Sequence, residues 1–242
     1  MVGARLFAGG RARRGLVVAA AAAGVLVVIA VAGTLLLGSH RAPAPLALGS
    51  PAASGPAASL VGSWKVTTGS EAGYRVREQF INQPAPTEAV ARTTQVSGSL
   101  KVSAAGSTIH ASSLDFKANL AALVSQDKYA NYQVYQRDFF IRTIYLQTDS
   151  FPNAEFTASS IDIPSAIESG PVSMTVSGKL NVHGVTNSVT TQLQAQRTAN
   201  GVEVAGSIHV DMRDFNVSVP SISFTTAEPQ VVIEYHLVLV RA

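Results

Sequence analysis

VSMTVSGKLNVHGVTNSVTTQLQAQR, residues 172–197, alternates apolar and polar side chains on both sides of a His-Gly pair. Successive side chains of a β-strand point to opposite faces, so this alternation indicates strands with one apolar and one solvated face. The glycine-containing pair His183-Gly184 is typical of a tight turn between them. The segment therefore predicts an antiparallel hairpin with strands at 171–183 and 185–197.

The same period of two recurs through most of the chain after Leu60. It predicts nine strands, near residues 62–68, 72–81, 89–104, 107–117, 154–162, 171–183, 185–197, 201–213 and 230–241. Short links such as Ala105-Gly106 and Asn200-Gly201 make consecutive strands antiparallel neighbours. Eight or nine such strands suit an up-and-down barrel or a strongly bent sandwich, and closure removes exposed sheet edges. We expect an all-β protein with an eight-stranded antiparallel up-and-down barrel.

Two stretches depart from the strand pattern. Residues 120–146 carry aromatic side chains at helical spacing, at Tyr129, Tyr132, Tyr135 and Phe139. Ser125 with Asp127 suits a helix start, so one or two short helices are expected to cap one end of the barrel. Residues 214–229 form a long apolar loop, and long loops in compact domains are usually functional. We expect this loop to fold over the barrel mouth as a lid.

An apolar run precedes the barrel sequence. Residues 15–38 contain 24 residues, of which only Thr34 is polar. At about 1.5 Å per residue this run is about 36 Å long as a helix, enough to cross a bilayer. We expect a single-pass signal anchor at 15–38, which makes the membrane a partner of the chain.

Four arginines, Arg5, Arg11, Arg13 and Arg14, precede the run and predict a cytoplasmic N-terminus by the positive-inside rule. The expected organisation is a basic tail at 1–14, the span, a Pro/Ala/Ser linker at 39–59 and an extracytoplasmic domain at 60–242. The localisation is therefore the cell membrane. A cleaved and secreted form is the alternative, but signal-peptide apolar cores are shorter, about 7–15 residues.

Charge and cysteine content exclude several kinds of function. The chain has 18 Lys and Arg against 15 Asp and Glu, and four of the arginines precede the apolar run. The remainder has no positive excess with which to bind phosphates, which argues against nucleic acid as a partner. The absence of cysteine excludes disulfides, thiol catalysis and thiolate metal sites.

No catalytic constellation is visible. His110, His209 and His236 fall on polar strand faces, His183 lies in a turn, and no two histidines have the spacing of metal ligands. The sequence has no nucleophile elbow and no glycine-rich phosphate loop. We therefore expect no catalytic residues, no metal and no cofactor, and a protein that is not an enzyme.

Four segments in order along the chain match one known family. They are GSWKV (62–66), RDFFIR (137–142) followed by Tyr145-Leu146 and Phe151-Pro152, VSGKLNVHGVT (176–186) and RDF (213–215). Together they resemble the YceI-like family over residues 60–242. The resemblance implies a lipocalin-like and mostly exported barrel, and several family members bind an isoprenoid chain in a long apolar cavity. The chain departs from the family at Glu78 and Phe140, where the family often has His.

The resemblance and the alternation together predict a ligand site among inward-facing side chains. The expected wall is Tyr74, Val76, Glu78, Met174, Val176, Leu180, Val204, Ile208, Val210, Met212, Ile233, Tyr235 and Leu237, and the expected lid residues are Phe215, Ile222 and Phe224. An eight-stranded barrel is just wide enough to hold one slender ligand.

Charged residues within this region have two interpretations each. Glu78 falls on the apolar face of its strand, so it either meets a ligand head group or Arg92, or lies solvated or paired near the rim. Arg92, Arg137 and Arg142 are possible head-group contacts. Arg137, Asp138 and Arg142 either line the mouth and contact a polar ligand end, or Arg137 and Asp138 cap the helix end and bridge to the sheet. The structural interpretation is favoured for Arg137, because it and its neighbour Asp138 point apart on a helix.

The sequence therefore predicts a membrane-anchored, extracytoplasmic protein that binds a long apolar ligand, such as a polyisoprenoid, an isoprenoid quinone or another lipid. The alternative is a cell-envelope interaction module whose barrel is filled and holds no ligand. The sequence gives no indication of the oligomeric state.

Overall fold

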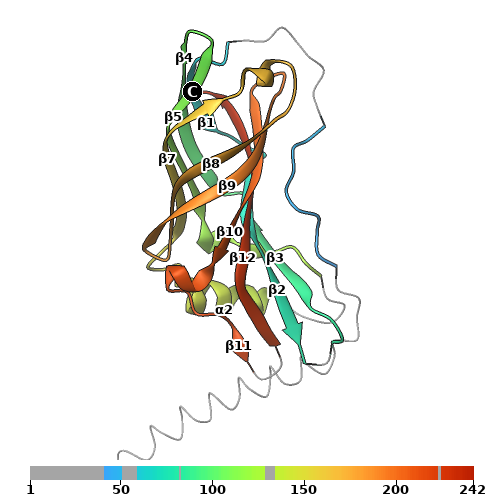
Figure 1. Cartoon of the computed structure of the whole chain (residues 1–242). Helices are drawn as coiled ribbons and strands as arrows, with labels where there is room; N and C mark the ends of the chain where they lie inside the picture. Colours follow the sequence, from blue (N-terminus) through green and yellow to red (C-terminus); the bar gives the residue numbers. More distant parts are fainter. Residues whose placement is uncertain (1–40, 51–58, 82, 129–133, 223–224) are drawn as a thin grey trace, which may run out of the picture.

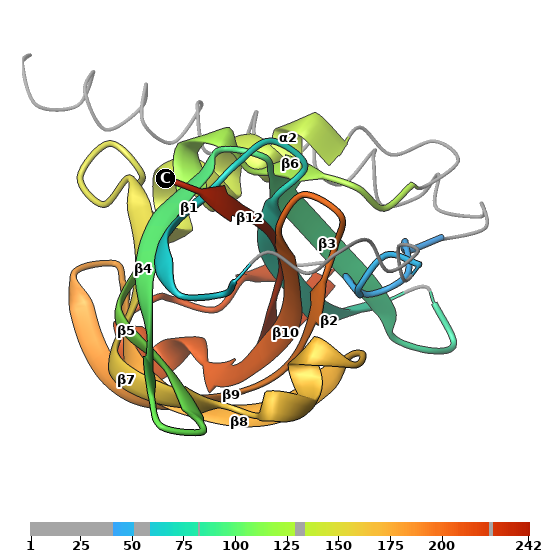
Figure 2. The ribbon, with the colours of Figure 1, turned by 90° about the horizontal axis from the view of Figure 1, so that it is seen from above.

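The computed structural model describes residues 41–50, 59–81, 83–128, 134–222 and 225–242. Eight antiparallel strands form a closed barrel, seen down its axis in Figure 2. In the order of the ring they are β1 (Gly62–Val66), β4 (Val96–Ala105), β5 (Thr108–Asn119), β7 (Asn153–Ile163), β8 (Val172–Val182), β9 (Val185–Arg197), β10 (Val202–Asp211) and β12 (Thr225–Arg241). The ring closes where β12 pairs with β1. The expected eight-stranded barrel is confirmed.

A second set of strands extends the wall at one end. β12 pairs with β1 through residues 239–241 and with β2 (Glu71–Phe80) through residues 225–236. β2 then pairs with β3 (Thr87–Thr93), and β3 pairs with β6 (Val124–Ser125). Figure 1 shows β2 and β3 below the closed ring, at the end where α2 (Val134–Phe140) and β11 (Ser221–Ile222) also lie. We call this the lower end, and the end that carries the β4–β5 turn the upper end.

Short helical segments complete the fold. They are η1 (Leu120–Ala122), η2 (Ile141–Tyr145), which continues α2, η3 (Ser165–Glu168) and η4 (Met212–Phe215). Among the described residues no helix is long and apolar enough to cross a membrane. The expected span at 15–38 lies outside the described residues, and so do Tyr129 and Tyr132.

The prediction of one strand over 89–104 is wrong. The structure has two strands there, β3 and β4, separated by Thr94 and Gln95. Counting alternate residues across this break reverses the faces, which placed Arg92 inside the barrel. In the structure Ala91 faces the core and Arg92 lies on the outer surface.

The predicted helix start at Ser125 and Asp127 is also wrong. Ser125 pairs with Ala91 in the sheet, the Asp127 carboxylate accepts a hydrogen bond from the Val90 N–H at 3.0 Å, and α2 begins at Val134. Side chains that cap helices serve equally well as acceptors for other backbone N–H groups, so their presence does not fix a helix boundary.

Two clusters of apolar side chains fill the barrel. The upper cluster includes Trp64 and Val176, and the lower cluster includes Leu180 and Phe215. Phe156 packs against both. Trp64 is 5% exposed, and its indole N–H donates to the Leu60 carbonyl at 2.8 Å, which satisfies its polar atom. The two clusters are therefore continuous along the barrel axis.

Residues 41–50, which we call the strap, lie along the outer surface of the barrel (Figure 1). At one end Arg41 forms an isolated bridge with Lys128, with backbone N–O distances of 3.2 and 3.1 Å. At the other end the Gly49 N–H donates to Glu203 at 3.1 Å, and Gln196 donates to the Gly49 carbonyl at 3.0 Å. Part of the expected linker, residues 41–50, thus lies against the barrel, and the division at residue 60 stays a prediction.

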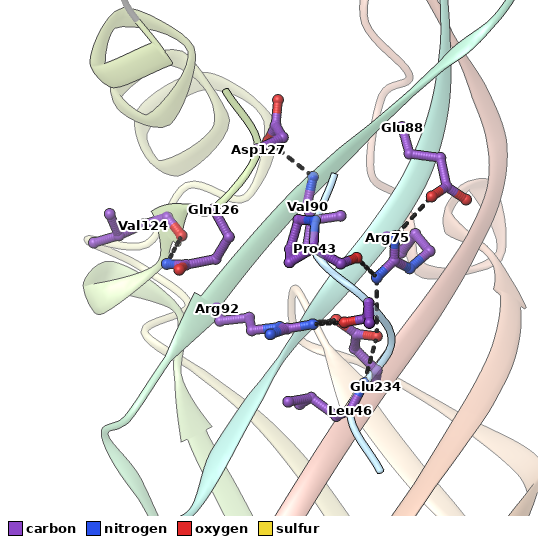
Figure 3. A network of polar contacts seen from close by, with 11 residues as sticks. Pro43, Leu46, Arg75, Glu88, Val90, Arg92, Val124, Gln126, Asp127 and Glu234 are labelled. Atoms are coloured by element: carbon purple, nitrogen blue, oxygen red, sulfur yellow. Dashed lines mark hydrogen bonds and ion pairs between the residues drawn. The ribbon is translucent and has the colours of Figure 1, made fainter. Parts of the chain in front are cut away.

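Arg75, Arg92 and Glu234 hold the middle of the strap (Figure 3). Arg75 donates to the Pro43 carbonyl at 2.8 Å and Arg92 to the Ala44 carbonyl at 2.6 Å. Glu234 is 2% exposed; it accepts from the Leu46 N–H at 3.3 Å and pairs with both arginines. The strap is therefore bound through charge-assisted hydrogen bonds, each worth about 1.5–3 kcal/mol.

Candidate functional site

Two apolar cavities lie inside the barrel. The upper cavity has a volume of about 150 Å³ and is lined by strands of the closed ring. Its wall contains eight of the predicted site residues, Met174, Val176, Leu180, Val204, Ile208, Ile233, Tyr235 and Leu237. Alternation on β8, β10 and β12 therefore identified the side chains that face this space.

The lower cavity has a volume of about 120 Å³ and lies towards α2. β2, β12, η2 and residues 217–220 contribute to its wall. The predicted residues found there are Tyr74, Val76, Glu78, Met212 and Ile233. Val217 and Val219, from the predicted loop at 214–229, line the lower cavity, so part of this loop contributes to a cavity wall.

Four residues line both cavities: Ala72, Ala118, Ala154 and Ile233. We call these four the neck. Ala118 and Ala154 are paired directly across β5 and β7, and three of the four side chains are single methyl groups. Because these side chains are small, the neck places few side-chain atoms of its own between the two cavities.

Some predicted site residues lie elsewhere. Val210 packs against the lower cluster, and Phe215, 1% exposed, belongs to it, so both are core residues beside the lower cavity. Arg92 is on the outer surface with Glu234, and Arg142 donates to the Leu123 carbonyl at 2.6 Å. The side chains of Ile222 and Phe224 lie outside the described part of the chain.

The wall formed by β4, β5 and β7 was missed by the sequence reasoning. It contributes, among others, Leu100, Val102, Leu114, Phe116, Phe156 and Ile161 to the upper cavity. On β5 the reason is local: Ser113 has a φ of 53°, and the β4–β5 register shifts beside it. Such an irregularity moves inward side chains from odd to even positions and hides the alternation. On β4 the alternation of Val96, Leu100 and Val102 was a usable signal.

A buried ion-pair network connects α2 to the sheet. Arg137, 8% exposed, donates to Asp127 at 3.0 Å and to the Ser125 hydroxyl at 2.6 Å. The distance from Arg137 Nη1 to the Glu78 carboxylate is 3.7 Å. Asp138 accepts from the Ser125 N–H at 3.0 Å. The geometry supports the structural interpretation of Arg137, and it pairs Glu78 with Arg137 rather than with Arg92.

This network places charge at one side of the lower cavity. Burial lowers the pKa of Arg137, but Glu78 and Asp127 outweigh that effect and raise the pKa above its ordinary value. Burial raises the pKa of the nearby Tyr74 hydroxyl, so this group stays neutral. Glu78 and Tyr74 line the lower cavity, together with other polar residues, among them Thr93, Tyr145, Ser218 and Glu228.

Tyr235 places one hydroxyl group in the apolar upper cavity. Its Oη lies 2.6 Å from Thr191 Oγ1, which itself donates to the Ser207 carbonyl at 2.9 Å. Tyr235 therefore donates to Thr191, and the polar atoms satisfy one another without a ligand. The upper cavity presents an apolar surface to whatever it holds.

Tyr235 also makes a testable contribution to alkaline stability. Burial raises its pKa to about 12, so the folded protein retains this proton while the unfolded chain loses it near pH 10. Stability from this group is complete below pH 10 and is lost as the pH rises towards 12. Denaturant unfolding at pH 9 and above should show a fall in stability to which Tyr235 contributes on the order of 2–3 kcal/mol, and Tyr235→Phe should remove that part. An unchanged slope in the variant would contradict this assignment.

No group in the described residues is arranged for metal binding: no three His, Asp or Glu side chains gather as ligands would. The class that fold and site define is a closed, lipocalin-like antiparallel barrel with an apolar interior.

The YceI-like domain matches residues 64–239, and the chain belongs to the YceI-like family. The solved structure of a polyisoprenoid-binding domain from Saccharophagus degradans, implicated in plant cell wall breakdown, is 17% identical with a TM-score of 0.53. The alignment covers 75% of this chain and 99% of that one. BcnA of Burkholderia cenocepacia is 19% identical over 70% of this chain and 96% of its own, with a TM-score of 0.48. The first of these similarities shows the shared fold. No protein of curated function matches the sequence.

Proposed function

We propose that this protein binds a long apolar ligand inside its barrel, with the chain of the ligand passing through the neck. The observation that carries the proposal is the pair of apolar cavities that share four lining residues, three of them alanines. Burying about 300 Å² of an apolar chain contributes about 7.5 kcal/mol before the costs of ordering it. Removal from water is therefore the main driving force for binding, and the function proposed is that of a binding protein rather than of an enzyme.

The size of the cavities defines how the ligand is accommodated. Sites for drug-sized ligands measure about 300–1,000 Å³, and a cavity of about 150 Å³ holds a molecule the size of benzene. Neither cavity alone holds a long chain. A long ligand requires the neck to widen and the two cavities to join, which makes a slender, flexible chain the best fit.

The ligand class is an isoprenoid or a similar lipid. The relative from Saccharophagus degradans is described as polyisoprenoid-binding, and the continuous apolar interior of this chain suits the same class. Glu78 and Tyr74 are positioned for a polar end group. We place this activity outside the cytoplasm, on a barrel tethered by residues 15–38, because that run is apolar and follows four arginines.

The small cavity volumes also favour a second candidate. A barrel filled by its own side chains would be a rigid scaffold that displays its outer surface to a partner in the cell envelope. The two functions differ in one measurable quantity, the presence of a lipid in the purified protein.

Native mass spectrometry of the full chain, released from detergent after purification from bacterial membranes, tests the proposal. We expect an adduct at one per chain that organic solvent removes, with masses spaced by isoprene units. The extract should rebind to the emptied protein. A chain that carries no adduct and takes up neither a quinone nor a polyprenol would replace binding with the scaffold function.

A further inference from the structure

Exposed apolar side chains gather at the lower end of the barrel. Among the described residues, five large apolar side chains are more than 40% exposed. Val124, Phe139 and Ile144, at 53%, 56% and 55%, lie on β6, α2 and η2, which are joined by the Ser125–Asp138 contact. Ile81, at 72%, follows the end of β2. Val61 alone is near the upper part of the barrel. We call Val124, Phe139 and Ile144 the apolar patch.

The strap brings the chain to the same end. Its first described residue, Arg41, is bridged to Lys128, which lies three residues beyond the end of β6. The ion pairs of Glu234 with Arg75 and Arg92 hold the following residues against the wall. The point at which the chain leaves the described barrel is therefore fixed relative to α2.

Distance then limits where a membrane can be. Only Ser39 and His40 separate the apolar run, which ends at Gly38, from Arg41. Three extended Cα steps span at most about 11 Å. The head-group layer on each side of a bilayer is about 5–8 Å deep. If residues 15–38 span the bilayer, Arg41 lies at the head groups, and so does the end of the barrel beside it.

Charge at this point agrees with a membrane surface. Arg41 and Lys128 are both exposed and are direct neighbours across the bridge. Two like charges opposite each other in a strand pair repel, and anionic head groups relieve this repulsion. Bilayer-facing apolar side chains flanked by basic residues are the usual composition of interfacial segments.

We propose that the apolar patch docks on the lipid bilayer, so that the lower end of the barrel faces the membrane. In this arrangement one face of η2 contacts the bilayer and another face lines the lower cavity. Ile144 of η2 is exposed, whereas Ile141 and Tyr145 of η2 line the lower cavity. One turn of helix separates the bilayer from the cavity, which gives an apolar ligand a short path between lipid and barrel. This inference rests on the proposed tether and deepens the proposed function.

Single-cysteine labelling of the full chain tests the docking, because the chain has no cysteine of its own. Phe139→Cys and Ile144→Cys, each carrying the fluorophore NBD, are reconstituted in vesicles of phosphatidylcholine and phosphatidylglycerol. The matched control is Ser107→Cys in the exposed β4–β5 turn, at the upper end. We expect blue-shifted emission at 139 and 144 and its loss on adding acyl-chain nitroxide lipids, with neither effect at 107.

A charge substitution adds an internal check. Ile144→Glu should reduce nitroxide quenching at 139, whereas Val61→Glu, also at an exposed position, should leave it unchanged. Vesicle flotation separates the possible failures. A chain that floats with all three labels in water overturns the docking and leaves the tether and the binding function standing. A chain that does not float overturns the tether and the docking together, while the lipid content found by mass spectrometry still decides the binding function.

Discussion

Arg137→Met is expected to lower the free energy of unfolding by about 3–5 kcal/mol, because it removes the guanidinium that faces two buried carboxylates. Asp127, 2% exposed, and Glu78, 8% exposed, both face this guanidinium. The substitution also removes one of the two contacts that join α2 to β6 through Ser125, and leaves the one with Asp138 in place. Urea unfolding followed by circular dichroism measures the loss.

Two further variants make this result specific to the buried charges. Arg142→Met removes one hydrogen bond, to the Leu123 carbonyl, from a partly exposed side chain and should cost about 1.5 kcal/mol, the lower limit for a bond to a charged group. Adding Asp127→Asn to Arg137→Met removes one stranded charge and should recover part of the stability. Equal losses for Arg137→Met and Arg142→Met would show that the network contributes nothing beyond ordinary hydrogen bonds.

Ile208→Trp combined with Leu237→Trp is expected to abolish ligand binding. Both side chains line the upper cavity, from β10 and β12, and are 3% and 6% exposed. Two indole rings occupy the space in which the ligand chain would lie. Overpacking costs about 1–3 kcal/mol of stability for each substitution, so circular dichroism must first show that the double variant is folded. The lipid content of the purified variant, measured by extraction, should fall from stoichiometric to none.

His209→Trp is the matched control for this variant. His209 is adjacent to Ile208 on β10 but exposed on the outer face, so the same ring is added without entering the barrel. This control should retain its lipid. Stoichiometric lipid in the folded double variant would place the ligand outside the upper cavity and contradict the proposed site.

The barrel was predictable because its strands have one apolar and one solvated face. Such strands alternate apolar and polar residues, and this alternation is visible in the sequence. Alternation fails where the backbone adds or removes a position. Because β3 and β4 are separate strands on either side of Thr94 and Gln95, Arg92 faces outward although the alternation of β4 predicts an inward position. On β5 the irregularity at Ser113, which has a positive φ, shifts the inward side chains from odd to even positions. Alternate residues face the same side of a sheet only within one uninterrupted strand.

The strap and the Arg137 network were beyond sequence reasoning for another reason. Residues 41–50 bind mainly through their backbone carbonyl and N–H groups, which every residue type provides, so the composition of the strap does not identify its partner. Glu234 and Arg92 meet only after the sheet has formed. The presence of Glu78 on an apolar face left a ligand contact, an ion pair and a solvated position at the rim all open, and it did not predict the pairing with Arg137.

The barrel cannot close until β12 has formed. It is the last strand in the described order, yet it pairs with β1, β2, β10 and β11. Trp64 of β1, near the start of the barrel, pairs with Arg241, so this edge of β1 stays unpaired until the last strand is present. Until residues 225–241 are available, the earlier strands have unpaired edges, and such edges are prone to aggregation. Synthesis of the chain thus passes through a long vulnerable interval, during which a chaperone that covers strand edges would have its greatest effect on yield.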